Sequence, residues 1–365
     1  MKAKILVFDK FLSYKTGGAQ LSLNTLLSSF PNNDFKYLGC EVKKSFSAGR
    51  LEESPFSVEK IKIREIPRFP YLEYCLNKRR IKKVVKKERA DLLIVQGFWA
   101  PLALNNFSGP KIYLIRDEFN LNEIKNYYSG FKALLKKLYL FFQRPFLRVI
   151  FKDNRKAIKE SGLVVANSQF IKRRLKEKFN KDSEVIYPLI NAERLKRENI
   201  PPFDQRKFIT LIGSKIIKGK PVVEKIAWRM KDRKFMIVGR NFKKPFWKNN
   251  IYYYPWQKDS LDIYKKSKIV LTPSLWNEAF CRVGVESMAL GIPCLGSNKG
   301  GIPEVLGERF IIKDIWNIDN WGEKIKWVEK NYKKFDLKER SLKFDQRRQI
   351  EKFKEIVKNN FNIEL

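Results

Sequence analysis

The sequence predicts an α/β protein with two doubly wound domains, each built from a parallel sheet between layers of helices. Short apolar runs alternate with amphipathic helical patterns along the chain. An uninterrupted apolar run is typical of a strand that is buried on both faces of a sheet. The alternation stops once, in a polar stretch with several prolines, and then starts again. Two Rossmann-like βαβ arrays in succession are therefore expected.

The first array predicts an N-terminal domain over residues 1–190. Its strands are expected at residues 4–8, 91–97, 111–117 and 163–168. Helical patterns cover residues 21–30 and 169–179. The segment 188–207 contains Pro188, Pro201 and Pro202 among charged residues, so we interpret it as a linker.

The second array predicts a C-terminal domain over residues 191–345. Strands are expected at residues 208–214, 234–239, 251–255, 268–274 and 292–297. Helices are expected at residues 220–230, 260–267 and 283–291, and a final helical stretch at residues 316–361. The last part of that stretch, residues 346–365, is expected to pack back on the N-terminal domain. Ligands of such folds bind at the carboxyl ends of strands, here in a cleft between the two domains.

The composition excludes several kinds of site. The 365 residues contain no histidine, which removes Ser-His-Asp and Cys-His catalysis and every His-ligated metal site. The four cysteines form no CxxC pair, so buried thiols in a reducing compartment are expected. The start of the chain does not read as a signal peptide, and no run of about 18 apolar residues occurs.

The net charge of +37 predicts an anionic partner, unless the charge is only spread over solvated helix faces. Residues 131–160 hold nine Lys or Arg, two acidic residues and six aromatic residues, and residues 77–91 add eight basic residues. A basic amphipathic helix with aromatic residues is typical of a membrane-surface element. The alternative is a pair of core-packed helices with solvated basic faces. Nucleic acid is the second choice of partner, because no recognition-helix, zinc-finger or RRM signature is present.

Residues 274–307, "SLWNEAFCRVGVESMALGIPCLGSNKGGIPEVLG", place Glu278 and Glu286 eight residues apart, followed by GIP and GGIPE. A strand should end at Ser274 and a helix should begin near Cys281. Such a turn presents free N–H groups and the positive end of the helix dipole, which suits a diphosphate. A carboxylate beside it can bind neutral hydroxyl groups.

This string resembles the retaining glycosyltransferases of the GT-B class, family 4 type (glycosyl transferases group 1). The resemblance implies that Glu278 holds the donor sugar and Glu286 the ribose. It also implies that four consecutive residues bind phosphate and sugar through backbone amides: Phe280, Cys281, Arg282 and Val283. Arg282 adds positive charge or simply faces solvent; both readings stay open.

"LIGSKIIKGKP" resembles the phosphate loop of the same family, in which Lys218 contacts the donor diphosphate. Many members have an arginine near the start of that loop, where this chain has Ser214. Lys215 or Arg240 is a candidate for the missing charge. Two further residues are candidates for donor binding: Gly239, in "MIVGRN", and Trp256, which stacks on the base or packs as an interdomain or core residue.

In the N-terminal domain, Gly17 and Gly18 resemble the family's GGA loop near the diphosphate. Glycine allows the backbone to approach a ligand closely. Arg116 stands where many members have a histidine that contacts the donor sugar. Asp117 orients Arg116, meets the acceptor or forms an interdomain salt bridge. The catalytic candidates are thus Glu278, Lys218 and Arg116.

The resemblance implies a retaining hexosyltransferase that uses a nucleotide sugar, a UDP- or GDP-sugar, as co-substrate and needs no other cofactor. No DxD motif is present, so metal independence is expected. The acceptor is expected to be a glycan or a lipid-linked glycan, and the protein to be cytoplasmic and peripheral at the inner membrane face. The alternative is a nucleic-acid-binding protein or a DNA-modifying glycosyltransferase. A dinucleotide-binding dehydrogenase is disfavoured, because no G-x-G-x-x-G follows the first strand.

Overall fold

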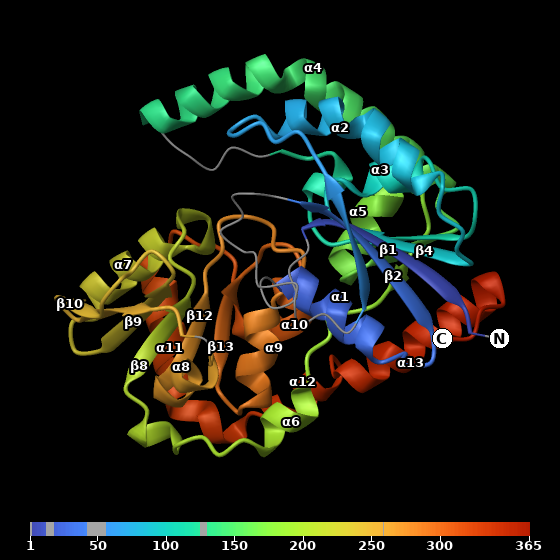
Figure 1. Cartoon of the computed structure of the whole chain (residues 1–365). Helices are drawn as coiled ribbons and strands as arrows, with labels where there is room; N and C mark the ends of the chain where they lie inside the picture. The colour runs from blue at the N-terminus through green and yellow to red at the C-terminus, as the bar shows by residue number, and fades with distance from the viewer. Residues whose placement is uncertain (1, 12–17, 42–55, 125–129, 258) are drawn as a thin grey trace. The chain divides into compact units, whose positions relative to one another are not determined.

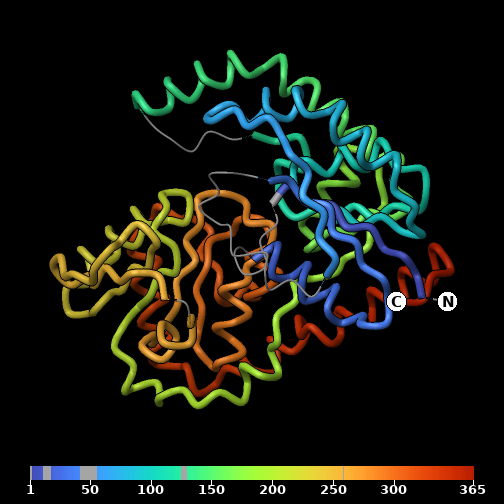
Figure 2. The backbone as a smooth tube through the Cα atoms, viewed as in Figure 1, coloured from blue at the N-terminus to red at the C-terminus, as the bar shows by residue number. Residues whose placement is uncertain are grey.

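The computed structural model describes residues 2–11, 18–41, 56–124, 130–257 and 259–365. The chain forms two compact units (Figures 1 and 2). The N-terminal unit contains Met1–Leu189 and Gln349–Leu365, and the C-terminal unit contains Ile190–Arg348. Each unit has a seven-stranded sheet and its own helices, which confirms the α/β class and the two Rossmann-like domains.

The sheet of the N-terminal unit is parallel throughout, in the order β3-β2-β1-β4-β5-β6-β7. Its strands are β1 (Lys4–Phe11), β2 (Asp34–Glu41), β3 (Ser57–Lys62), β4 (Leu92–Gln96), β5 (Lys111–Ile115), β6 (Leu163–Ala166) and β7 (Glu184–Val185). The predicted strands are β1, β4, β5 and β6. Strands β2, β3 and β7 were not predicted. Only Ile61 of the six residues of β3 is buried, which is typical of an edge strand.

Helices cover this sheet and connect its strands. They are α1 (Gly18–Ser28), α2 (Pro70–Val85), α3 (Ala100–Leu104), α4 (Gly130–Glu160), α5 (Gln169–Phe179) and α13 (Gln346–Phe361). Among the described residues, no helix is long and apolar enough to cross a membrane.

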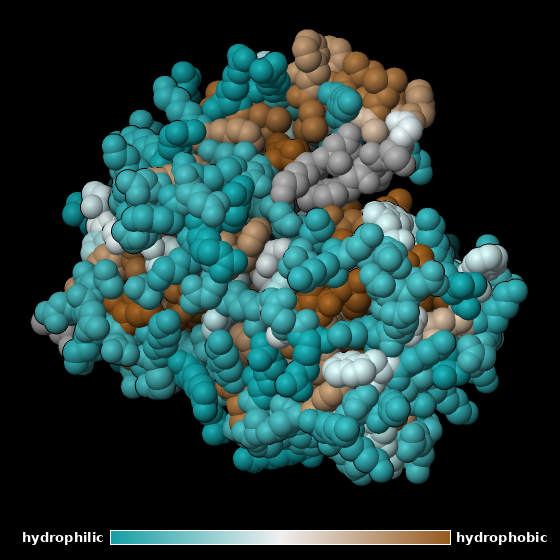
Figure 3. All heavy atoms as spheres, turned by 180° about the vertical axis from the view of Figure 1, so that it is seen from behind, coloured by the Kyte–Doolittle hydropathy of each residue, from teal (hydrophilic) through white to brown (hydrophobic). Residues whose placement is uncertain are grey.

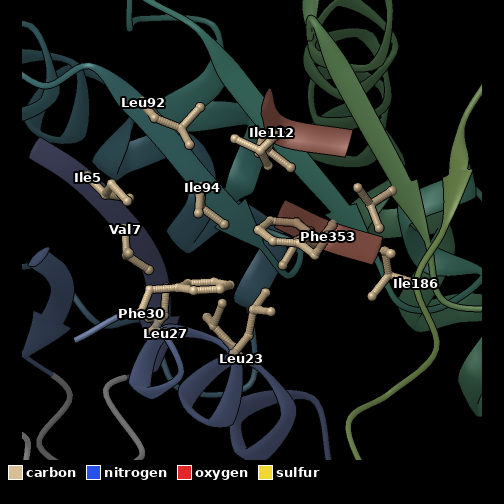
Figure 4. Packing of buried hydrophobic residues seen from close by; sticks show 14 of the residues in the cluster. Ile5, Val7, Leu23, Leu27, Phe30, Leu92, Ile94, Ile112, Ile186 and Phe353 are labelled. Atoms are coloured by element: carbon tan, nitrogen blue, oxygen red, sulfur yellow. The ribbon is translucent and has the colours of Figure 1, made fainter. Parts of the chain in front are cut away.

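Helix α13, at the end of the chain, completes the core of the N-terminal unit. Its apolar residues Phe353, Ile356 and Val357 share one helix face and lie in the same cluster as residues of β1, β4, β5 and α1 (Figure 4). The ring of Phe353 stacks on Phe30 with 6.2 Å between centroids. The last helix is therefore an integral part of the first domain.

The sheet of the C-terminal unit has the order β10-β11-β9-β8-β12-β13-β14, and only β10 is antiparallel to its neighbour. Its strands are β8 (Phe208–Ile212), β9 (Lys234–Gly239), β10 (Phe246–Lys248), β11 (Ile251–Pro255), β12 (Ser267–Thr272), β13 (Cys294–Ser297) and β14 (Ile311–Ile312). Its helices are α6 (Ala192–Arg197), α7 (Lys220–Arg229), α8 (Leu261–Lys266), α9 (Arg282–Ala289), α10 (Ile302–Leu306), α11 (Ile318–Asn331) and α12 (Leu337–Leu342).

Two expectations about this unit need correction. The expected linker contains helix α6, whose N-terminus is capped by the Asn191 side chain accepting from Arg194 N. The expected final helical stretch is divided into α11, α12 and α13. The Asp336 carboxylate accepts from Glu339 N and starts α12 as a separate helix. Capping side chains, rather than prolines, set these boundaries.

Candidate active site

The carboxyl ends of β8, β9, β11, β12 and β13 lie at one edge of the C-terminal sheet, because these strands are parallel. All the predicted donor-binding residues after residue 190 follow one of these strands or lie in helix α9. The topology therefore gathers one group of sequence candidates at one edge of a single domain, where ligands of doubly wound folds bind.

The loop after β8 sets the position of Lys218. A short 3₁₀ turn, Ile216–Lys218, ends at Gly219, which has a φ of +88°. A Cβ atom on Gly219 would lie 2.0 Å from the carbonyl oxygen of Pro273, so only glycine fits there. The turn directs Lys218 toward the next loop, where its Nζ lies 2.9 Å from Oε1 of Glu278. The predicted Lys-Gly pair thus has a defined structural role.

Glu278 is held in place by several groups. Glu278 is 8% exposed, and its Oε1 accepts hydrogen bonds from Lys218 Nζ and from the Ser274 hydroxyl. The carbonyl oxygen of Ser274 in turn accepts from the Ser297 hydroxyl at 2.8 Å. The Lys218 side chain is 34% exposed, so one end of this ion pair remains open to solvent and to a ligand.

The GGIPE segment packs directly against the backbone of Glu278. Gly300 has a φ of +61°, and a Cβ there would lie 2.1 Å from Glu278 O. Gly301 N donates to the same oxygen at 2.7 Å. The two glycines therefore support the loop that carries the buried carboxylate, which explains why the motif follows the glutamates in the sequence.

Helix α9 presents Glu286 one turn after its start. Its carboxylate accepts from Arg282 Nε at 2.7 Å and from the Tyr264 hydroxyl at 2.8 Å. Arg282 therefore forms an ion pair along the helix and orients Glu286. Cys281 provides no side-chain cap for α9. Burial raises the pKa of the Cys281 thiol to about 12, so it stays protonated near neutral pH.

The other two amide candidates flank Cys281 and Arg282. Phe280 is buried, and its ring contacts Phe344 edge to face at 5.6 Å. Val283 lies half-buried in the first turn of α9. The first N–H groups of an α-helix lack intrahelical acceptors, so this turn is suited to an anion.

A second group of candidates lies at the ends of β8, β9 and β11. Trp256 N donates to Gly239 O at 3.2 Å, and the Arg240 guanidinium lies 5.4 Å from the Trp256 ring centroid. Ser214 forms a hydrogen bond with the Asn241 side chain. Trp256 is 41% exposed, so its indole is not a core side chain.

The candidates in the N-terminal unit are Gly18 and Arg116; Gly17 lies outside the described residues. Gly18 is the first residue of α1, and Arg116 follows β5. Burial lowers the pKa of Arg116 to about 10, while the charge of Asp9 acts in the opposite direction. The Asp117 carboxylate accepts from Asn120 N at 3.0 Å, and burial raises its pKa.

Sequence reasoning missed several polar residues near these candidates. Asp9 and Lys10 lie near the end of β1, where Lys10 forms a buried ion pair with Glu73 and Asp9 accepts from Gln96 Nε2 at 2.8 Å. Charged residues directly after an apolar strand were a usable signal for this pair. Tyr264 gave no comparable signal, because its contact with Glu286 depends on the packing of α8 beside α9. In the described part of the chain, no three Asp, Glu or Cys side chains are grouped so that they could hold a metal ion.

Comparison with known proteins agrees with this architecture. The model of the Glycosyltransferase Family 4 family matches residues 17–194, and the model of Glycosyl transferases group 1 matches residues 224–346. Spore coat protein SA of Bacillus subtilis (strain 168) is 39% identical over 71 residues, which span 19% of this chain and 19% of that protein.

Solved structures match over nearly the whole chain. A glycosyltransferase from Rickettsia africae ESF-5 has a TM-score of 0.67 at 18% identity, covering 98% of each chain. Anabaena HepE in complex with UDP-glucose has a TM-score of 0.71 at 16% identity, covering 98% of this chain and 100% of that one. Sucrose-phosphate synthase from Thermosynechococcus elongatus has a TM-score of 0.73 at 12% identity, covering 99% of this chain and 100% of that one. With two family models matching consecutive parts of one GT-B fold, the chain belongs to the group 1 glycosyltransferases of the family 4 type.

Proposed function

We propose that the protein transfers a hexose from a nucleotide sugar to a glycan or lipid-linked acceptor, with retention of anomeric configuration. The observation that carries the proposal is the Lys218–Glu278 pair at the carboxyl ends of β8 and β12, next to the start of helix α9. A cation, a buried carboxylate and a helix N-terminus at one edge fit the three parts of such a donor: diphosphate, sugar and nucleoside.

Each group has a separate part in donor binding. Lys218 and the first turn of α9 neutralise the diphosphate, and Glu278 accepts hydrogen bonds from sugar hydroxyls. Glu286, already oriented by Arg282 and Tyr264, accepts from the ribose diol. Arg240 and Trp256, which lie against each other, are proposed to contact the base or a phosphate. The UDP-glucose bound to Anabaena HepE supports a uridine nucleotide as the first candidate.

In the proposed reaction the bond between the anomeric carbon and the diphosphate oxygen breaks first, through an oxocarbenium-like state. The acceptor hydroxyl attacks the same face, and its proton passes to the departing phosphate oxygen. Lys218 stabilises the charge that develops on the leaving group. Retention by this route needs no protein nucleophile, so the buried, protonated Cys281 is not required to act as one.

The donor class can be tested by thermal unfolding in the presence of UDP, GDP, ADP, CMP and their sugars. A ligand that binds only the native state at 100 times its dissociation constant stabilises by about 2.7 kcal/mol, so one nucleotide should raise Tm clearly. The Lys218→Ala variant should lose most of that shift, whereas Lys234→Ala, at an exposed lysine that starts strand β9, should keep it. No shift with any nucleoside diphosphate or its sugar would contradict the proposed donor class.

We expect chelation to leave activity unchanged. In DxD enzymes a divalent ion balances the diphosphate charge, and here Lys218 and the α9 N–H groups are proposed to do so. The measurement is the transfer rate with and without EDTA, with a DxD-type glycosyltransferase as the sensitive control. Loss of activity that Mn²⁺ or Mg²⁺ restores would contradict metal independence.

A further inference from the structure

Helix α4 exposes large apolar side chains along the first half of its length. Six of them are between 48% and 72% exposed: Phe131, Leu134, Leu135, Leu138, Phe141 and Phe142. Their spacing of three, four and seven residues places them on one side of the helix, and we call them the α4 apolar face. Exposed apolar groups of this density usually mark an interaction surface. In Figure 3 hydrophobic side chains gather at the upper right, over this end of α4.

The apolar face is not the surface by which α4 packs on its own domain. The buried residues of the helix include Gln143, Leu147, Ile150 and Asn154, which lie on the opposite side. Specific contacts hold this packed side in place, among them the ion pair between Lys78 Nζ and Asp153 Oδ2 at 2.7 Å. The second half of α4 is therefore anchored to the domain, and the apolar face of the first half remains exposed.

The charge around the apolar face indicates what that partner is. Exposed basic residues lie beside the apolar ones: Lys137, Arg144 and Arg148. The acidic residue Asp153 is already paired with Lys78, and Glu160 lies at the far end of the helix. A surface that combines apolar side chains with net positive charge complements an anionic lipid bilayer, which offers acyl chains beneath negative headgroups.

Two other partners fit these observations less well. A second copy of the chain would place the same basic residues opposite one another, which repels. Nucleic acid is bound through phosphate contacts with Lys and Arg and gains little from an extended apolar helix face. The bilayer alone uses both the charge and the exposed apolar groups.

We propose that the N-terminal domain docks on an anionic membrane by the α4 apolar face. The docking surface is argued from α4 alone, whereas what docking implies for the acceptor rests on the proposed function. Because α4 lies between β5 and β6 of a parallel sheet, its first residues lie at the carboxyl edge of that sheet. The same edge carries Asp9, Lys10 and Arg116. Docking therefore brings this polar edge close to the bilayer, where an acceptor carried on a lipid is presented.

Vesicle sedimentation of the full chain tests the docking surface. We expect binding to phosphatidylcholine vesicles that contain phosphatidylglycerol, much weaker binding to pure phosphatidylcholine, and weakening as salt rises. The double variant Phe141→Ser, Phe142→Ser should bind at least about tenfold more weakly, since burial of each ring contributes on this scale. Phe146 is unsuitable for such a test because it is half-buried.

The matched control is Trp228→Ser, which removes a 70% exposed aromatic residue from the other domain and should leave vesicle binding unchanged. Unaltered Tm values show that both variants remain folded. Absence of wild-type binding, or equal losses in both variants, would overturn the proposal. So would a dimer that the double variant converts to monomers, or tight duplex DNA binding without vesicle binding. The nucleotide-induced Tm shift of the double variant should be normal, so failure of docking is distinguishable from failure of the donor assignment.

Discussion

Lys218→Ala is expected to reduce transferase turnover by about two to three orders of magnitude while the protein stays folded. Removal of one preorganised charge-stabilising group from a transition state typically costs this much. Lys218 is the cation that contacts Glu278, and it lies on a short turn with its side chain one-third exposed. Its loss therefore affects the leaving diphosphate more than the core. The measurement is kcat with saturating donor, together with the thermal unfolding profile.

Lys234→Ala is the control for this prediction. Lys234 belongs to the same domain, is exposed, and starts strand β9 at the opposite edge of the sheet from Lys218. The control removes the same charge from the domain, so a general effect of net charge would appear in both variants. Turnover near that of the wild type in Lys218→Ala, or an equal loss in Lys234→Ala, would show that Lys218 does not stabilise the leaving group.

Glu278→Gln separates the carboxylate from the lysine. Glutamine keeps the size of the side chain but removes the charge that Lys218 and the Ser274 hydroxyl now share. We expect lower kcat with retained nucleotide affinity, because the change removes the proposed contact with the donor sugar and keeps Lys218, the proposed contact of the diphosphate.

Most central strands of both sheets could be predicted from the sequence because they are buried on both faces; the exception is β2, which was not predicted although most of its residues are buried. All five residues of β4 are buried, and such a strand appears as a continuous apolar run. Strand β3 has a single buried residue, and the two-residue strands β7 and β14 are too short for any periodicity. Edge strands owe their conformation to a neighbour, which local sequence does not reveal.

The candidate site likewise has residues that could be predicted from the sequence and residues that could not. Lys218 and Glu278 are visible in the sequence because each belongs to a motif with a glycine, Gly219 or Gly300, that a tight backbone approach requires. Other polar pairs are set by packing: Tyr264 reaches Glu286 from a helix 22 residues away, and Lys10 reaches Glu73 across 63 residues. No local pattern specifies those pairs.

Gly300→Ala is expected to lower the Tm of the C-terminal domain by about 5–15 °C, corresponding to about 2–4 kcal/mol. Two costs combine. A left-handed backbone costs a residue with a Cβ about 1–2 kcal/mol. The Cβ would also lie 2.1 Å from Glu278 O and 2.7 Å from Glu278 N, which are backbone atoms that cannot move aside alone.

The steric clash also has a functional consequence. The hydrogen bond from Gly301 N to Glu278 O would be strained or broken, so the loop that holds the buried carboxylate would shift. Gly300→Ala should therefore reduce turnover per folded molecule as well as Tm. Calorimetry and steady-state assays below the unfolding transition measure the two effects separately.

Gly291→Ala provides a closely matched control in the same domain. Gly291 has a φ of +67°, against +61° for Gly300, so the conformational cost of alanine is nearly the same. Its Cβ would meet only Cε of Lys338 at 3.2 Å, the far end of a flexible side chain. We expect a Tm decrease of about 2–4 °C and normal turnover, because only the backbone strain of about 1 kcal/mol remains. If the two variants lose the same Tm and the same activity, the approach of Gly300 to Glu278 does not support the site.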